Sequence, residues 1–192
     1  MTRRAFYAVN GITVYRIVAV PLLLALIFRH EWSWFRWLLV LSFLTDAVDG
    51  FLARRYHVIS KAGAILDSIG DDLTVLVAII GMFVLDPAFF RKELAGVLLL
   101  LFLYCFQLLA ALVKYGRLTS FHTWLAKAAA ILQGCFLILF FFLSHHLPSW
   151  LFLLTAGVTC LDLLEEIIMV FLLPHWRADV RGLHTILGKG RK

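Results

Sequence analysis

Six long runs of apolar residues, separated by short polar connections, dominate the pattern of this 192-residue chain. The runs cover residues 9–28, 34–53, 62–85, 94–113, 124–143 and 151–173. Each is close to the roughly 20 residues that cross a bilayer as a helix. Backbone polar groups in hydrocarbon need internal partners. We therefore expect an all-α bundle of six transmembrane helices that forms a single domain over residues 1–192.

Composition agrees with this membrane assignment. Hydrophobic residues make up 62% of the chain and charged residues 16%, and the mean hydropathy is +0.92. A typical soluble domain is about half apolar and a quarter charged. The three cysteines, Cys105, Cys135 and Cys160, fall inside apolar runs without CxxC spacing, so we expect buried free thiols and no redox site.

The basic residues predict how the chain is oriented. A net charge of +6 suggests nucleic-acid binding, but the basic residues flank the apolar runs, as the positive-inside rule favours. With alternate loops on one side, fourteen of the eighteen Lys and Arg residues lie near the same face. We therefore predict an integral protein of the cytoplasmic (inner) membrane, with both termini and the 54–62 loop in the cytoplasm and no nucleic-acid partner.

The first apolar run resembles a signal peptide, because Arg3 and Arg4 precede it. However, Asn10, Thr13 and Arg16 interrupt the run, and no small-residue cleavage site follows it. We expect a retained first helix, on which these three polar residues share one face because they are three positions apart.

Acidic residues are concentrated between positions 46 and 72, which hold five of the twelve in the chain. The pattern is Asp46-x2-Asp49-Gly50-x2-Ala53-Arg54-x8-Gly63-x3-Asp67-x3-Asp71. Acidic side chains at the edge of apolar spans are costly and usually mark function.

Helical spacing gathers these residues. Asp46, Asp49, Gly50 and Ala53 are spaced i, i+3, i+4, i+7, and so lie on one helical face, while Asp67 and Asp71 share a face of the next helix. The short connection makes the two helices antiparallel neighbours. Four carboxylates this close would repel each other unless cations lay between them, and oxygen ligands suit Mg²⁺, Mn²⁺ or Ca²⁺ rather than zinc.

The complete pattern resembles the signature of the CDP-alcohol phosphotransferases, D-x2-D-G-x2-A-R-x8-G-x3-D-x3-D, and every signature position matches. Asn10-x2-Thr13-x2-Arg16, followed by Pro21, is similar to the opening of the family's first helix. The resemblance implies transfer of a phosphatidyl or other phospho-alcohol group from a CDP-linked donor to an alcohol, with release of CMP. The expected donor is CDP-diacylglycerol, although CDP on a head group stays open.

The resemblance also implies roles for individual residues. Two divalent ions, Mg²⁺ or Mn²⁺, would be bound by Asp46, Asp49, Asp67 and Asp71, and Asp71 would also take the proton of the acceptor hydroxyl. The donor-binding positions would be Asn10, Thr13, Gly50, Ala53, Arg54, Ser60 and Gly63. A homodimer is implied by the resemblance alone.

The acceptor stays open. Many phosphatidylglycerophosphate-synthase-like members carry lysine where this chain has Asp72. Candidate acceptor contacts are Arg16, Lys114, Arg117 and Lys127. As alternatives, Arg16 would snorkel to the interface, and the other three would be ordinary positive-inside charges. Asp162, Glu165 and Glu166 form an acidic stripe that would either pair with Arg16 or Lys127 or contact the acceptor.

Two other functions were weighed. A divalent-cation transporter would use the aspartates as an ion site, but such proteins usually show internal repeats and ligands at the bilayer centre. A prenyltransferase would also use Mg²⁺ and acids, but its motifs have different spacing and lack the Gly-x2-Ala-Arg element.

Overall fold

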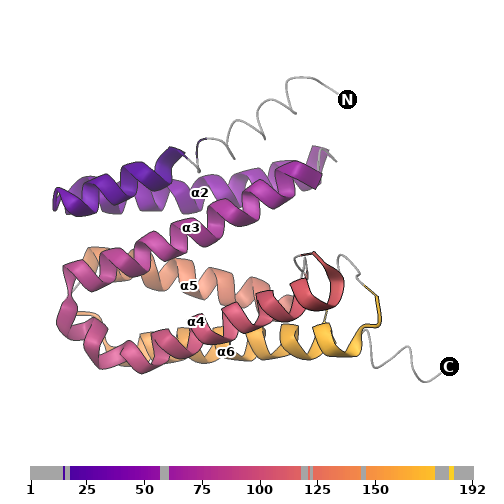
Figure 1. Ribbon diagram of the computed structural model, residues 1–192. Coiled ribbons are helices and arrows are strands. Elements are labelled where there is room, and N and C mark those ends of the chain that lie inside the picture. Colours follow the sequence, from indigo (N-terminus) through magenta and orange to yellow (C-terminus); the bar gives the residue numbers. More distant parts are fainter. Residues whose placement is uncertain are drawn as a thin grey trace. The chain divides into compact units, whose positions relative to one another are not determined.

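The structure, a computed structural model, describes residues 15, 18–56, 61–117, 121, 123–143, 146–175 and 182–183. Side chains are described for the same residues except 46–56 and 61–68. Throughout these ranges the regular secondary structure is helical, as Figure 1 shows, which confirms the all-α prediction.

Five labelled helices follow a shorter apolar helix, Val18–Phe28. They are α2 (Trp32–Tyr56), α3 (Lys61–Leu85), α4 (Pro87–Tyr115), α5 (Trp124–Leu143) and α6 (Ser149–Leu172). The predicted runs agree within three residues at each end, except at the start of α4, which begins seven residues early. The first predicted run is described only from Val18 onward.

Two of these helices, α4 and α5, are long and apolar enough to cross a membrane on their own composition, judged over the described residues. The coarser prediction of a helical, membrane-associated chain is therefore supported. The full set of six spans and the cytoplasmic termini stay predictions.

Local chemistry explains where several helices begin and end. Pro87 opens α4, a position that suits proline because the first N–H of a helix has no intrahelical partner. Gly116 ends α4 with a φ of 63°, in the left-handed region that glycine tolerates. The helix Val18–Phe28 has a similar end, because His30 just beyond it has a φ of 55°. There, the N–H of His30 donates to the Ile27 carbonyl and the N–H of Glu31 to the Leu26 carbonyl, which is a Schellman motif.

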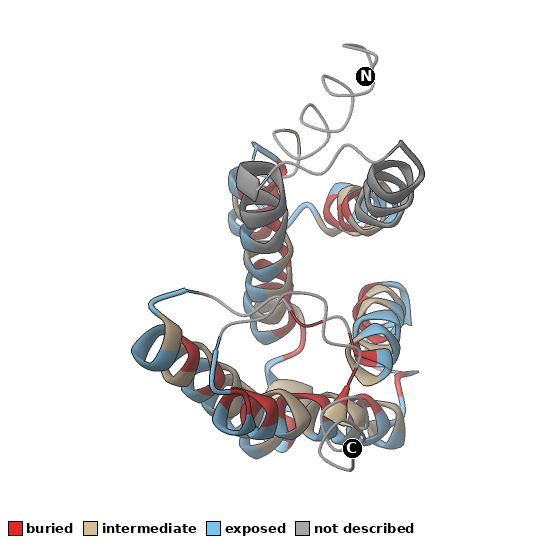
Figure 2. Cartoon of the chain, turned by 90° about the vertical axis from the view of Figure 1, so that its right-hand side faces the viewer, coloured by how far each residue is buried: buried red, intermediate tan, exposed pale blue. Residues whose placement is uncertain are grey.

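The chain divides into two compact units, which are described separately. Unit 1 consists of Met1–Pro87 and Leu137–His145, and unit 2 of Ala88–Phe136 and His146–Lys192. In both, the helices carry their buried positions along one side and exposed positions along the other, as the colours of Figure 2 show. Exposed apolar residues are numerous, as expected of helices whose outer faces contact lipid.

An aromatic cluster forms the core of unit 1. The Phe35 ring of α2 lies 4.6 Å from that of Phe141 in α5, measured between ring centroids, and Trp32 stacks on Phe141 at 6.4 Å. Gly81 of α3 faces both phenylalanines, since a Cβ there would lie 3.0 Å from Cζ of Phe141 and 3.1 Å from Cζ of Phe35. A larger residue at this position would require the two rings to shift by a few tenths of an ångström.

The core of unit 2 joins α4, the 116–123 connection and α6. Ala111, Phe121, Met169, Val170 and Leu173 are buried together, and Leu183 from the C-terminal segment packs against them. At the other end of α4, the ring of Phe152 in α6 fits over Gly96, where a Cβ would lie 2.9 Å from Cε1 of the ring. Gly96 thus leaves room for the Phe152 ring against α4.

Candidate active site

The aspartate signature lies on two helices that contact each other. Residues from Asp46 to Arg54 belong to α2, and residues from Gly63 to Asp71 belong to α3. Both helices belong to unit 1, and they are in direct contact. The predicted helical hairpin is therefore present.

A stripe of buried residues runs along α2 toward the aspartates. Phe35, Leu39 and Ser42 are 0%, 0% and 1% exposed, and they recur at steps of four and three residues. The same alternation continues to positions 46, 49 and 53, so Asp46, Asp49 and Ala53 extend the stripe that the buried residues define.

A matching stripe runs along α3. Thr74 and Ala78 are 2% and 0% exposed, and Asp71 precedes them by three and seven residues. Asp67 lies one further turn back, on the same stripe. Asp71 is half-buried and Asp72 is exposed. The register therefore points Asp71 and Asp72 in different directions.

The described side chains contain no group of three His, Cys, Asp or Glu residues arranged to hold a metal ion. Of the four signature carboxylates, only that of Asp71 belongs to this described set. The donor chemistry fits the predicted ions, because the four carboxylates that two contacting helices carry are the hard oxygen ligands that Mg²⁺ and Mn²⁺ take. The ion site stays a prediction.

The predicted donor-binding residues fall in two groups. Gly50, Ala53, Arg54 and Gly63 lie in helices whose side chains are not described at these positions. Asn10, Thr13 and Ser60, together with the acceptor candidate Arg16, lie outside the described residues. Their assigned roles stay predictions.

The remaining acceptor candidates lie in unit 2. Lys114 is exposed at the end of α4, and its Nζ donates to the carbonyls of Val170 at 2.9 Å and Phe171 at 3.0 Å. Arg117 is exposed just beyond the same helix. Lys127 is exposed on α5, with its Nζ 4.8 Å from the centroid of the Trp124 ring.

Tyr115 provides a second hydrogen-bond donor at the end of α6, which was not predicted from the sequence. The hydroxyl of Tyr115 lies 2.8 Å from the carbonyl oxygens of both Val170 and Leu173. The last carbonyls of a helix lack intrahelical partners. Lys114 and Tyr115 of α4 together provide hydrogen-bond donors for these carbonyls.

The acidic stripe of α6 has neutral partners among the described residues. Nε2 of Gln107 donates to Oε2 of Glu166 at 3.0 Å, and the hydroxyl of Thr123 lies 3.5 Å from Oδ1 of Asp162. The backbone N–H of Leu183 donates to Oε1 of Glu165 at 3.0 Å. Sequence reasoning expected a cation or an acceptor here and missed Gln107, although it is the single amide inside the apolar run of α4.

Among the known proteins that the chain resembles, three illustrate the range of partial matches. Over 87 residues the chain is 37% identical to a cardiolipin synthase (CMP-forming) of Streptomyces coelicolor, a match covering 42% of this chain and 40% of that protein. It is 40% identical over 75 residues to a CDP-diacylglycerol–glycerol-3-phosphate 3-phosphatidyltransferase of Cereibacter sphaeroides (37% and 34% covered). A CDP-diacylglycerol–inositol 3-phosphatidyltransferase of Saccharomyces cerevisiae is 36% identical over 66 residues (34% and 30% covered).

These matches span two fifths or less of each relative's length. No solved structure was found that matches the chain. The sequence profile of one family, described as CDP-alcohol phosphatidyltransferase, matches residues 6–161 and so includes the complete aspartate signature of α2 and α3. On this match, the chain belongs to the CDP-alcohol phosphatidyltransferase family.

Proposed function

We propose that this chain is a membrane enzyme of phospholipid biosynthesis that transfers a phosphatidyl group from CDP-diacylglycerol to an alcohol and releases CMP. The observation that carries the proposal is the complete aspartate signature on two contacting helices, in a chain whose family profile covers residues 6–161. The three relatives named above are all phosphatidyltransferases or CMP-forming synthases by name.

The donor would be held through its phosphates. Arg54 presents a planar fork of N–H donors that matches phosphate oxygens. Gly50 and Gly63 keep the helix surfaces low, so that the nucleotide can approach the backbone. Asn10, Thr13, Ala53 and Ser60 complete the proposed donor site.

Asp46, Asp49, Asp67 and Asp71 would hold two divalent ions, Mg²⁺ or Mn²⁺. When bound, the ions supply charge neutralisation at the donor pyrophosphate and stabilise CMP as a leaving group. Buried stripes precede these positions on α2 and follow them on α3, and the two helices are in contact. Carboxylates carried by packed helices are held more accurately than carboxylates on loops.

Asp71 would act as the general base. Its carboxylate accepts the proton of the acceptor hydroxyl while the hydroxyl oxygen attacks the phosphorus that bears diacylglycerol. A new phosphorus–oxygen bond forms, the bond from that phosphorus to the CMP oxygen breaks, and CMP departs as the anion. Asp71 is half-buried rather than fully enclosed. Most of the rate acceleration would come from positioning and charge stabilisation.

The acceptor would be an alcohol of the kind named for the relatives, such as glycerol 3-phosphate or inositol. Arg16, Lys114, Arg117 and Lys127 are the proposed contacts for an acceptor phosphate. Lys114 has the least capacity for this role, because two of its three N–H donors already serve the carbonyls of α6.

We also propose the six-span arrangement, with both termini and the aspartates at the cytoplasmic face and two chains forming a homodimer. Its supports are the fourteen-to-four distribution of basic residues, the two apolar helices of spanning length, and, for the dimer, the family resemblance.

The test is a reconstitution with the purified full-length chain. CDP-diacylglycerol in nanodiscs is incubated with Mg²⁺ or Mn²⁺ and a panel of alcohols, CMP is quantified, and lipid products are identified by mass spectrometry. We expect CMP release that requires one class of alcohol, stops with excess chelator and returns when ions are restored.

Full activity in chelator would remove the two-ion mechanism. If the folded protein releases no CMP with any alcohol, the proposal is wrong. In that case, uptake of Mn²⁺ into sealed vesicles would establish the transporter alternative.

A further inference from the structure

Two buried hydroxyl residues lie one helical turn from the signature aspartates. Ser42 of α2 is 1% exposed, and Thr74 of α3 is 2% exposed. Ser42 precedes Asp46 by four residues, and Thr74 follows Asp71 by three. Residues at these spacings are neighbours on the surface of a helix. Each of the two aspartates therefore has a buried hydroxyl residue as its neighbour on the same helix.

The pairing of α2 with α3 brings the two hydroxyl residues to about the same height in the hairpin. At its far end, Gly81 of α3 faces Phe35 of α2, since a Cβ at position 81 would lie 3.1 Å from Cζ of the ring. Seven residues from this contact toward the connection between the helices, α2 reaches Ser42 and α3 reaches Thr74. Seven residues further, both helices reach signature aspartates. Ser42 and Thr74 thus form a hydroxyl layer about 10 Å along the helices from that contact, on the way to the carboxylates.

Both hydroxyls are bonded to their own helix in this structure. Oγ of Ser42 donates to the Leu38 carbonyl at 2.9 Å, and Oγ1 of Thr74 donates to the Gly70 carbonyl at 2.7 Å. Bonds of this kind are the ordinary way in which a hydroxyl within a helix finds a partner. They explain how the two hydroxyls are tolerated at buried positions, but they do not explain why hydroxyls occur next to the aspartates.

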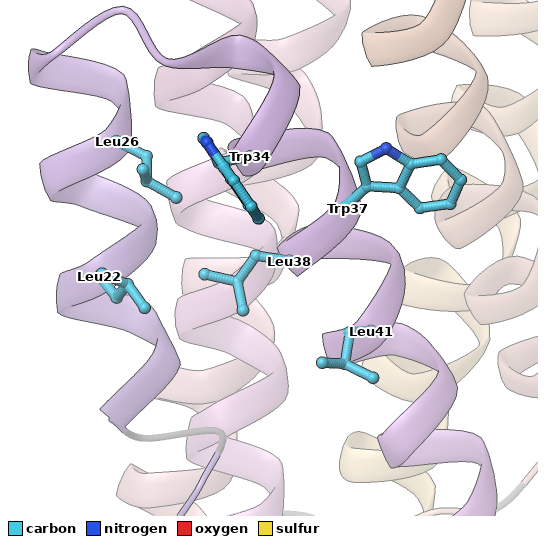
Figure 3. Close-up of a pocket in the computed structure, with 6 residues that line it drawn as sticks. All are labelled: Leu22, Leu26, Trp34, Trp37, Leu38 and Leu41. Carbon is cyan, nitrogen blue, oxygen red and sulfur yellow. The ribbon is translucent and has the colours of Figure 1, made fainter.

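Serine and threonine are concentrated near the aspartates in both helices. Beyond the first turn of α2 they occur at positions 42 and 45, within four residues of Asp46, and in α3 at positions 68 and 74, within three residues of Asp71. Farther from the aspartates, the buried positions described in the two helices are Phe35, Leu39, Val77, Ala78, Gly81 and Met82, which have no polar side chain. A groove beside α2, shown in Figure 3, is also lined by hydrophobic side chains throughout: Leu22, Leu26, Trp34, Trp37, Leu38 and Leu41. The hydroxyls thus accompany the aspartates rather than the packing of the helices.

We propose that Ser42 and Thr74 are positioning residues, whose hydroxyls donate to the carboxylates of Asp46 and Asp71 when divalent ions are bound. The inference rests on the proposed function, because it takes these aspartates to be ion ligands. Carboxylates that bind a metal ion are commonly oriented by hydrogen bonds from neighbouring groups. A hydroxyl can turn to suit its surroundings. Rotation of either side chain would therefore move its hydrogen bond from a helix carbonyl, which keeps its backbone partner, to the carboxylate.

The first test measures ion binding without the reaction. Mn²⁺ is titrated into the purified full-length protein, and free Mn²⁺ is measured by electron paramagnetic resonance. Ser42→Ala and Thr74→Val should each weaken Mn²⁺ binding about tenfold, whereas Thr74→Ser, which keeps the hydroxyl, should bind Mn²⁺ as the unchanged protein does. The matched control is Thr155→Val in unit 2, because Thr155 is 5% exposed and its hydroxyl also donates to a carbonyl of its own helix, that of Leu151 at 2.9 Å. This variant should not change Mn²⁺ binding.

The second test separates positioning from a purely structural role. In the CMP-release assay, the Mn²⁺ concentration that gives half-maximal rate should rise about tenfold in Ser42→Ala and Thr74→Val, in step with the weaker binding. The rate at saturating Mn²⁺ should change little, because excess ion fills the weakened site. A hydroxyl that served only the packing of its helix would lower the temperature of unfolding, as Thr155→Val does, and leave the Mn²⁺ dependence where it was.

Unchanged Mn²⁺ affinity in both Ser42→Ala and Thr74→Val would overturn the inference, as would an equal loss in Thr74→Ser or Thr155→Val. If the Mn²⁺ affinity depends on the two hydroxyls but no alcohol supports CMP release, the positioning role stands and the proposed reaction fails. If CMP release requires Mn²⁺ but its affinity does not depend on the hydroxyls, the reaction stands and the positioning role fails. A folded, unchanged protein that binds no Mn²⁺ would contradict both.

Discussion

Both units of this molecule carry carboxylates on long apolar helices, but the partners of these carboxylates differ between the units. In unit 2, Asp162, Glu165 and Glu166 of α6 each accept a hydrogen bond from a neutral group of the same chain. In unit 1, the signature aspartates extend two buried stripes of contacting helices, and divalent ions are their proposed partners.

The difference shows that acidity within a membrane helix does not by itself define an active site. Buried polar groups are stable when hydrogen-bonded, and an amide, a hydroxyl or a backbone N–H is sufficient. The α6 acids are therefore interpreted as part of the packing of unit 2. The α2 and α3 aspartates are interpreted as chemical groups, because their spacing is that of the family signature.

The largest effect should come from the proposed base. Asp71→Asn keeps the shape of the side chain but cannot accept the proton, so turnover should fall about 10²–10⁴-fold while the donor still binds. Asp49→Asn should lose donor binding as well, because a ligand of the proposed ions is weakened. CMP release and CDP-diacylglycerol affinity are measured for both variants. Near-normal turnover of Asp71→Asn, or loss of donor binding as complete as in Asp49→Asn, would show that Asp71 is not the base.

The α6 acids offer the contrasting test. Gln107→Leu removes the amide that donates to Glu166 and should lower the free energy of unfolding by about 1–3 kcal/mol, the cost of an unsatisfied buried group. Replacing both partners, as Gln107→Leu with Glu166→Leu, should restore much of that loss. Thermal unfolding in detergent gives the stabilities, and CMP release per folded molecule should stay constant. If Glu166→Gln abolished turnover at unchanged stability, the distinction between the two regions would break down.

A substitution at Arg54 tests whether a basic residue near the aspartates binds the donor or is an ordinary surface charge. Arg54→Lys keeps the charge but loses the planar fork, so the apparent KM for the donor should rise about tenfold, and that for the acceptor should stay the same. Arg55→Lys, at the next position of α2, is the matched control. An unchanged donor KM would leave Arg54 as an ordinary charge at the membrane surface.

The smallest effect is expected at the end of α6. Tyr115→Phe removes one hydroxyl donor from its terminal carbonyls and should cost about 1 kcal/mol of stability without altering turnover. Lys114→Met should behave in the same way. A rise in the acceptor KM of Lys114→Met, absent in Tyr115→Phe, would instead assign Lys114 to the acceptor.

Local pattern was sufficient to predict the helices and the aspartate hairpin. Residues 124–143 were predicted to be helical with the same limits as α5. The prediction for α4 began at residue 94 because Asp86-Pro87 resembles a turn and Arg91, Lys92 and Glu93 are polar. Proline at the first helical position and polar residues near a membrane surface are both compatible with helix.

Contacts between distant residues were not predictable from spacing. Gln107 and Glu166 are 59 positions apart, and Lys114 and Val170 are 56 apart. Their pairing depends on how α4 and α6 lie against each other in the folded chain, which the spacing of residues along the sequence does not reveal. The first helix ends at Phe28, as predicted, although the left-handed residue that follows it is His30 rather than the usual glycine.

The contact of Gly81 in α3 with the rings of Phe35 and Phe141 affects the angle between α2 and α3, and through that angle the positions of the aspartates. Phe35 is eleven residues from Asp46 on α2, and Gly81 is ten residues from Asp71 on α3. The two helices are thus clamped at a point about 15 Å from the carboxylates. A tilt of about 4° at the clamp displaces the far ends by about 1 Å, enough to cost an enzyme about 100-fold in rate. A larger side chain at position 81 would therefore affect the proposed reaction from about 15 Å away, by changing the angle between α2 and α3.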